Sequence, residues 1–245
     1  MPFAVLFLAA LWAGCQNALA GGGSFLTLPA LILTGMDARA ANITSTVALF
    51  PGQVLTGWHG RGHASGVGTL SLRTLIIISL VGGALGAVLL LLTPSRIFAS
   101  MVPWLVLFAT TMFAWGSFGP KRQGGPRMSS AMAGGAQFCI AVYGGYFGGG
   151  IGFLMLAALT AAGLAIRNAA ANKNVLAAVM NLSAVLIFVF SPEVHWPQMI
   201  TACTGALIGG YAGSQMLRNV NEKILRIFIV CIGVALTIGL FLRAP

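Results

Sequence analysis

The sequence predicts an all-α polytopic membrane protein made of two inverted repeats, each a re-entrant or broken helical hairpin plus three transmembrane helices. Hydrophobic residues make up 58% of the 245 positions and charged residues 7%, whereas soluble domains carry about 25% charged residues. Two glycine triplets, residues 21–23 and 148–150, interrupt apolar stretches at matching places. Each triplet is followed by a short apolar run, a turn and a segment that opens on polar residues, so the chain contains a duplicated unit.

Apolar runs separated by short polar breaks predict the individual helices. A helix needs about 20 residues to cross a bilayer, with a range of about 17 to 25. Most of the segments reach this length, but the two that follow the glycine triplets do not. The predicted segments are residues 3–20, 22–35, 40–58, 70–92, 97–117, 130–147, 149–163, 168–190, 196–217 and 223–242.

Basic residues predict how these segments are arranged in the membrane. If each triplet region crossed the membrane once, the basic residues would divide evenly between the two sides. If each enters and returns on the same side, the division becomes strongly unequal, as the preference of basic residues for the cytoplasm requires. The larger group is then Arg61, Arg73, Lys121, Arg122, Arg127, Arg167, Arg218, Lys223 and Arg226, and the smaller is Arg39, Arg96 and Arg243.

This arrangement predicts the domain organisation and the orientation. The first repeat spans residues 1–118, a cytoplasmic basic linker spans residues 119–128, and the second repeat spans residues 129–245. Both termini are expected outside. A re-entrant hairpin and a pair of full crossings both return the chain to the side of the membrane from which it entered. The short second arms favour re-entry.

The triplets are the first candidates for a binding site. Glycine lets the chain turn sharply and brings bare backbone N–H groups within reach of a ligand. A helix that starts after such a break directs its positive dipole end toward an anion. Close helix packing by small residues is the alternative interpretation. The residues concerned are Gly21, Gly22, Gly23, Gly148, Gly149 and Gly150.

Polar residues at the start of the following helices complete the predicted site. Lys173 lies further inside a predicted span than any other basic residue, and charge inside a membrane is costly unless it is compensated. Its ammonium either contacts an anion or reaches back to the membrane interface. The neutral hydrogen-bonding candidates around it and in the first repeat are Asn42, Thr44, Ser45, Thr46, Asn172 and Asn174.

Two further pairs match across the repeats. Gln53 and Asn181 follow the polar helix starts, where they either join the site or form an interhelical hydrogen bond. Arg39 and Arg167 precede the polar residues. Basic residues at helix ends mostly set orientation, and as a pair they would recruit anions at two entrances.

Several functions are not expected. The acidic residues Asp37, Glu193 and Glu222 fall in predicted loops, as do all three histidines, so we expect neither an enzyme active site nor an intramembrane proton relay. The four cysteines lack metal-ligand spacing, and no metal or other cofactor is expected.

Cytoplasmic loop residues account for the net charge of +10, so we expect a lipid bilayer and a small anion as partners and no nucleic acid. The oligomeric state stays open.

The glycine motif resembles that of a known family. Residues Gly21 to Gly23, Pro29 and Leu31, followed by residues 41–45, resemble the TauE/SafE family of sulfite and organosulfur-anion exporters. The resemblance implies a bacterial inner-membrane carrier for sulfite, sulfonates or related small anions, which we expect to work by alternating access. In the second repeat Leu156 and Ala158 replace the proline and leucine, and Lys173 replaces Ser45. An anion channel, or a carrier for another small anion, is the alternative.

Overall fold

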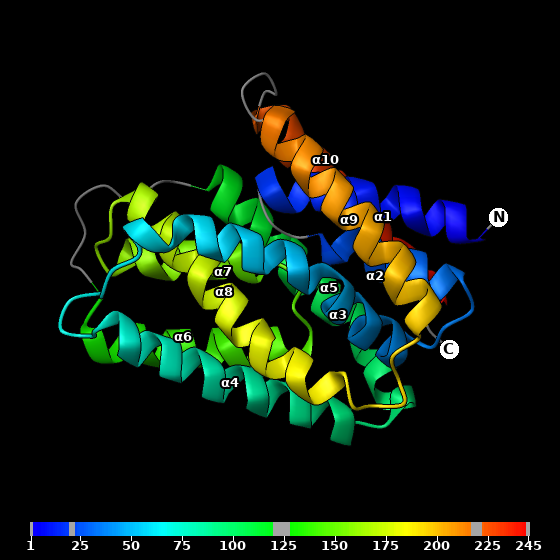
Figure 1. Cartoon of the computed structure of the whole chain (residues 1–245), viewed down its shortest axis with the longest axis horizontal. Helices are drawn as coiled ribbons and strands as arrows, with labels where there is room; N and C mark the ends of the chain where they lie inside the picture. The colour runs from blue at the N-terminus through cyan, green and yellow to red at the C-terminus, as the bar shows by residue number, and fades with distance from the viewer. Residues whose placement is uncertain (1, 20–22, 120–127, 217–221, 244–245) are drawn as a thin grey trace.

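A computed structural model of the chain describes residues 2–19, 23–119, 128–216 and 222–243, and these residues are predominantly helical (Figure 1). The all-α prediction is confirmed for this part of the chain, where the only extended pairing is an isolated bridge between Val67 and Leu70. The elements are α1 (Pro2–Leu19), α2 (Ser24–Leu33), α3 (Ala38–Gly60), η1 (Arg61–His63), α4 (Leu72–Leu92), α5 (Ser95–Phe118), α6 (Ser130–Tyr146), α7 (Ile151–Ala161), α8 (Ile166–Phe188), α9 (Trp196–Met216) and α10 (Glu222–Arg243).

Local sequence signals explain several helix ends. Asp37, Ser71 and Ser129 cap α3, α4 and α6, because each side chain accepts hydrogen bonds from backbone N–H groups of the first helical turn. The turns after α2 and α7 contain Gly35 and Gly163, whose φ angles are +92° and +98°. Glycine adopts this left-handed backbone without steric cost. The polar helices α3 and α8 therefore begin after matching turns.

The lengths of the helices agree with a membrane protein. Among the described residues, α4, α5 and α8 are long and apolar enough to span a bilayer. The prediction of short helices after the glycine triplets is confirmed, since α2 has 10 residues and α7 has 11. At a rise of 1.5 Å per residue, each covers roughly half of a hydrocarbon core about 30 Å thick.

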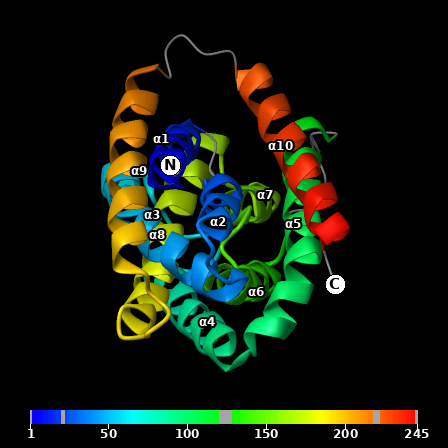
Figure 2. The same cartoon turned by 90° about the vertical axis from the view of Figure 1, so that its right-hand side faces the viewer.

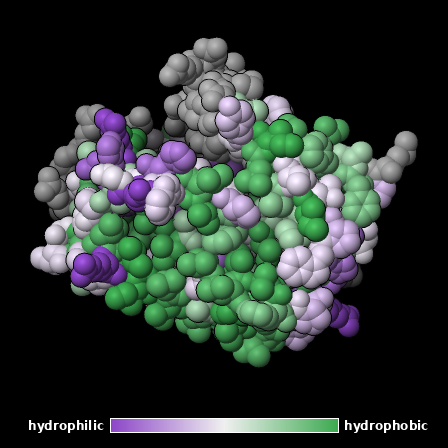
Figure 3. Space-filling view, in the orientation of Figure 1, coloured by the Kyte–Doolittle hydropathy of each residue, from purple (hydrophilic) through white to green (hydrophobic). Residues whose placement is uncertain are grey.

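Large hydrophobic side chains cover much of the surface. Leu92, Trp115 and Phe190 are 74%, 68% and 85% exposed, and Figure 3 shows hydrophobic residues across most of the face that it draws. A soluble monomer rarely exposes a contiguous apolar area of this kind. These side chains are suited to contact with lipid.

The helices pack in matched pairs when α1 to α5 are compared with α6 to α10. Helix α1 packs on α9 as α6 packs on α4, and α3 packs on α9 as α8 packs on α4. The remaining large contacts join α3 with α8 and α5 with α10, which are corresponding helices of the two halves. In Figure 2, α9 and α10 lie on opposite sides of the molecule, with α2 and α7 between them.

Glycine permits the closest of these contacts. A Cβ atom at Gly209 in α9 would overlap the carbonyl oxygen of Leu11 in α1, and one at Gly145 in α6 would overlap that of Gly83 in α4. Small residues let helix backbones approach in membranes. The short helices α2 and α7 are thus held inside a closely packed frame.

Candidate substrate-binding site

The second glycine triplet forms a sharp break between α6 and α7. Gly148 and Gly150 have φ angles of +78° and +74°, which side chains with a Cβ rarely adopt. Gly150 is the N-cap of α7, and no side chain caps the helix. The N–H groups of Phe153 and Leu154 bond to Gly150 O. Those of residues 149–152 have no acceptor among the residues that the structure describes, so the start of α7 has hydrogen-bonding capacity for a ligand.

The first triplet is described only at Gly23, and Gly21 and Gly22 lie outside the described residues. The N–H of Gly23 donates to Oδ1 of Asn17 at 3.4 Å. Its carbonyl oxygen accepts from the N–H groups of Leu26 and Thr27. At this position the protein supplies its own acceptor, in contrast to the start of α7.

The start of α2 and the glycine break before α7 line one cavity. Ser24 and Phe25 of α2 line it together with Phe147 and Gly149 from the second break. The space open to the centre of a water molecule is about 10 Å³, which holds roughly one water. The remaining lining residues are Leu28, Pro29, Ile32, Val106, Leu236 and Leu240. The first residues of α2 therefore lie close to the second break, around a space too small for a sulfo group.

Lys173 of α8 lies beside the first turn of α7. A Cβ atom at Gly152 would be 3.5 Å from its Cδ and 3.9 Å from its Nζ. The side chain is partly buried, and in the described part of the chain no acidic residue pairs with it. A lysine ammonium and the positive end of a helix dipole thus lie together. An anion is the partner that stabilises both charges.

The first repeat places neutral groups at the corresponding position. Thr27 Oγ1 of α2 and Ser45 Oγ of α3 form a buried hydrogen bond of 2.6 Å. In the second repeat the corresponding elements are α7 and Lys173 of α8. The hydroxyl groups and the ammonium are all suitable donors to an oxyanion.

Asn42 connects α3 to the second break. Its Nδ2 donates to the carbonyl oxygen of Tyr146 at 3.1 Å, and Tyr146 is the last residue of α6. Asn42 O accepts a hydrogen bond from Thr46 Oγ1 within α3 at 2.9 Å. Asn42 therefore holds the chain immediately before the glycines, and Thr46 is engaged with its own helix.

Thr44 and Asn172 occupy matching positions, and each holds a loop of the other half. Thr44 Oγ1 donates to Glu193 O at 3.4 Å and accepts from His195 N at 3.3 Å. Asn172 Nδ2 donates to Ser65 O at 2.8 Å, and its Oδ1 accepts from Ser65 N at 2.7 Å. We call Thr44 and Asn172 the loop clamps. The residue pattern placed both in the predicted binding site but gave no sign of these loop contacts.

The remaining polar candidates lie along the contact between α3 and α8. Asn181 Nδ2 donates to Gln53 Oε1 at 2.6 Å, which establishes the interhelical hydrogen bond that the sequence left as an alternative. Asn174 packs against Gly57 and Gly60 of α3. The structure thus brings Lys173, Ser45 and Asn42 close to the breaks, and it sets Asn174 and Asn181 against α3.

Comparison with known proteins identifies the family. Residues 6–240 match the family model described as sulfite exporter TauE/SafE. The chain belongs to the TauE/SafE family. The resemblance predicted from the glycine motif is therefore confirmed over nearly the whole chain.

Curated relatives of this TauE/SafE protein are named as transporters. The probable membrane transporter protein YfcA of Escherichia coli is 28% identical over 239 residues, covering 95% of this chain and 87% of the relative. A probable membrane transporter protein of Haemophilus influenzae is 28% identical over 240 residues, covering 96% and 92%. The probable membrane transporter protein ORF9 of a Sinorhizobium species is 29% identical over 246 residues, covering 97% and 91%. The chain is thus a member of a membrane transporter family.

The structure adds residues to this site that the sequence did not indicate. Tyr146 and Phe147 flank the second break, and Ser24 and Phe25 open α2 at the shared cavity. Their proximity to the triplets along the chain was the available signal. Within the described residues no group of three or more His, Cys, Asp or Glu side chains lies together as a metal site.

Proposed function

We propose that this protein is a carrier, and in the cell an exporter, of small sulfur-containing anions such as sulfite or organosulfonates. One observation carries the proposal: the open N-terminus of α7 and the ammonium of Lys173 lie together, with no acidic side chain of the described chain paired to either. Positive groups in a membrane protein require a compensating charge. An oxyanion supplies that charge together with several acceptor oxygens.

The proposal assigns the substrate contacts to backbone and side-chain donors near the second break. The backbone N–H groups of residues 149–152 and the Lys173 ammonium bind the sulfo oxygens, and Ser45 and Thr27 add hydroxyl donors from the first repeat. The first triplet, Gly21 to Gly23, contributes from the opposite side, as its place in the duplicated unit indicates. The loop clamps and Asn42 position the elements around the proposed site. In this conformation Thr46 bonds within its own helix and Asn174 packs against α3, so neither is assigned a substrate contact.

Alternating access between two inverted repeats accounts for the arrangement of helices. The matched packing of α1 on α9 and of α6 on α4 supports an internal two-fold relation. Membrane carriers with discontinuous helices place the substrate between such repeats. The repeats are residues 1–118 and 129–245, joined by the cytoplasmic linker of residues 119–128, and both termini lie outside the bacterial inner membrane.

Export of an anion needs no coupling ion in this mechanism. A bacterial cell is negative inside, and the membrane potential contributes about 2.3 kcal/mol per charge per 100 mV. Among the described residues no acidic side chain pairs with Lys173, which agrees with transport driven by the potential.

Two measurements on the purified protein test the proposal. Calorimetric titration with sulfite, thiosulfate, sulfoacetate, taurine and sulfate identifies the substrate class, and binding of at least one sulfur oxyanion is expected. Flux into liposomes is expected to saturate with concentration, as a carrier requires. Flux that rises linearly with concentration would indicate the alternative, a channel. If only anions without sulfur bind, a carrier for another small anion replaces the proposal.

A further inference from the structure

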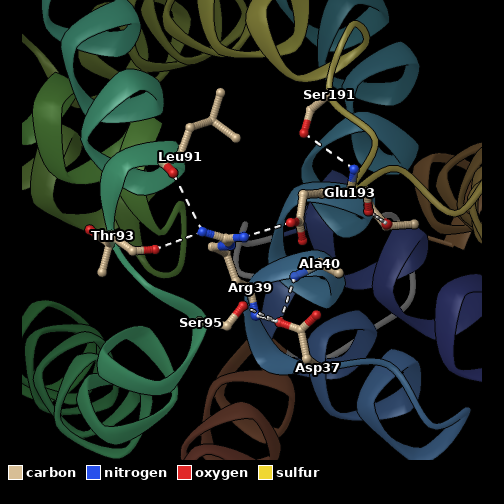
Figure 4. Close-up of polar contacts among 9 residues, drawn as sticks. Asp37, Arg39, Ala40, Leu91, Thr93, Ser95, Ser191 and Glu193 are labelled. Atoms are coloured by element: carbon tan, nitrogen blue, oxygen red, sulfur yellow. Dashed lines mark hydrogen bonds and ion pairs between the residues drawn. The ribbon is translucent and has the colours of Figure 1, made fainter.

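Arg39 is the centre of a polar cluster at the end of the molecule where α3 begins. Its Nη1 donates to the carbonyl oxygens of Thr93 at 2.8 Å and Leu91 at 3.4 Å, and its Nη2 bonds to Glu193 Oε1 (Figure 4). The Arg39 and Glu193 side chains are only 18% and 22% exposed. Partial burial strengthens a charged hydrogen bond relative to one on an open surface.

The cluster joins elements of both halves of the chain. Arg39 lies in the first turn of α3, Thr93 follows α4, and Glu193 lies in the loop between α8 and α9. Asp37 caps α3 and accepts a hydrogen bond from Ser95 Oγ at the start of α5, at 3.0 Å. A change in the distance between α3 and the α8–α9 loop therefore breaks the ion pair between Arg39 and Glu193.

The counterpart of Arg39 in the second half behaves differently. Arg167 is exposed, and its side chain forms no ion pair or hydrogen bond within the described chain. Membrane orientation alone explains an exposed arginine. It does not explain a partly buried arginine held by a carboxylate and two carbonyl groups. The structure thus assigns Arg39 a role that Arg167 does not share.

An open cavity of about 390 Å³ adjoins the ion pair. Apolar side chains from α4, α8 and the α8–α9 loop line it with Arg39 and Glu193, so it offers a guanidinium beside an apolar wall. A short organic sulfonate has the matching chemistry, because its sulfo group pairs with a guanidinium and its carbon portion contacts apolar residues. The principal apolar lining residues are Leu91, Ile187 and Phe190.

Hydrogen bonds connect the cluster to the second glycine break. Tyr146 Oη donates to Thr93 Oγ1 at 3.3 Å, and Asn42 Nδ2 donates to the carbonyl oxygen of Tyr146 at 3.1 Å. Gly148 follows Tyr146 by two residues. Asn42 therefore lies between Arg39 and the break, and it is 2% exposed.

We infer that Arg39 and Glu193 form a gate in which the Glu193 carboxylate occupies a second anion site. With the ion pair formed, this end of the molecule is closed. A sulfonate or sulfite ion that leaves the α7 site takes the place of the carboxylate on Arg39, the α8–α9 loop separates from α3, and the anion escapes through the adjoining cavity. The inference rests on the proposed function, and its first test needs no substrate.

The first test measures access to a cysteine behind the gate. In a background without the four native cysteines, Asn42→Cys is labelled with a membrane-impermeant maleimide in the presence and absence of Glu193→Gln. Glu193→Gln removes the charge and keeps the shape, so labelling is expected to become at least about tenfold faster. Arg167→Gln is the matched control and should leave the rate unchanged. A rate within about twofold of the parent in Glu193→Gln would overturn the gate.

A second test asks whether Arg39 accepts a sulfo group. Glu193→Cys in the same background is expected to melt at a lower temperature than its parent, because Arg39 loses its ion-pair partner. Reaction with a sulfonate-bearing methanethiosulfonate should restore the melting temperature, whereas the trimethylammonium reagent should lower it further. Equal effects of the two reagents would contradict a second anion site. Neither test measures transport, so both distinguish failure of the gate from failure of the carrier hypothesis.

Discussion

Thr44 and Asn172 are buried polar residues whose partners lie within the protein, in contrast to Lys173. Both side chains satisfy backbone N–H and C=O groups of a loop from the other half, and unpaired backbone groups at membrane depth would be costly. Lys173, by contrast, has no acidic partner among the described residues. Thr44 and Asn172 are thus paired within the protein, and the proposed anion is the partner that Lys173 lacks.

Removal of one loop clamp tests whether Thr44 has a structural role. Thr44→Val leaves the His195 N–H and the Glu193 carbonyl without their side-chain partner, at a cost of about 1 to 3 kcal/mol. A lower melting temperature is expected in detergent. Thr111→Val is the control, because Thr111 is exposed and its hydroxyl bonds only to Leu107 of its own helix. Equal melting temperatures in the two variants would show that the clamp contributes no stability.

The sequence predicted that Thr44 and Asn172 were polar residues near helix starts, but it did not predict their partners. The hydroxyl of Thr44 contacts residues about 150 positions away along the chain, and Asn172 contacts a residue 107 positions away. Periodicity and spacing report neighbours within one helix. Contacts between halves depend on the tertiary fold, so a binding role was the only chemistry visible from the residues.

The short helix α7 and the break before it are the central elements of the proposed site. Two glycines with positive φ end α6 and start α7 without a side-chain cap. The sequence predicted this break, since three consecutive glycines in an apolar stretch interrupt a helix. The sequence did not reveal that the start of α2 and the break before α7 line one cavity, because that depends on the tertiary packing that also brings Val106 of α5 and Leu236 and Leu240 of α10 to it.

Substitution of the middle glycine tests the role of the break. A Cβ at Gly149 would overlap the ring of Phe147 and enter the shared cavity. Gly149→Leu is therefore expected to abolish anion binding and transport in a protein that still inserts into the membrane. Gly135→Leu is the matched control, since no atom of the described chain lies within 4 Å of a Cβ at exposed Gly135 in α6. Unchanged binding in Gly149→Leu would leave the triplet a packing role.

For the whole molecule, the contacts of the fold bring Arg39 and Arg96 to the same end. Arg39 contacts Thr93 at the end of α4, close to Ser95 and Arg96 at the start of α5. Arg61 lies in η1, which packs on α8. The apolar composition and the two glycine triplets were enough to predict the helical class and the short broken helices, because apolar runs and glycine breaks are read from neighbouring residues. The duplicated unit was also visible in the sequence, but which helices of the two halves pack on each other was not.

Cysteine labelling in intact cells tests the orientation. Both termini and Arg96 are expected outside, and Arg61 and Arg167 inside, because most basic residues then face the cytoplasm. A membrane-impermeant reagent should label Arg96→Cys in intact cells and Arg167→Cys only after the membrane is opened. Labelling of Arg167→Cys from outside would contradict the inverted-repeat arrangement.

Anion titration of Lys173→Met tests the central claim most directly. If the ammonium binds the substrate beside α7, its removal should weaken sulfur-oxyanion binding by about 1.5 to 3 kcal/mol, roughly ten- to a hundredfold. Lys173→Arg should be intermediate, since the charge is kept and the shape changes. Arg73→Gln, at an exposed basic residue of α4, should bind as the wild type does. Wild-type affinity in Lys173→Met would contradict the proposed site.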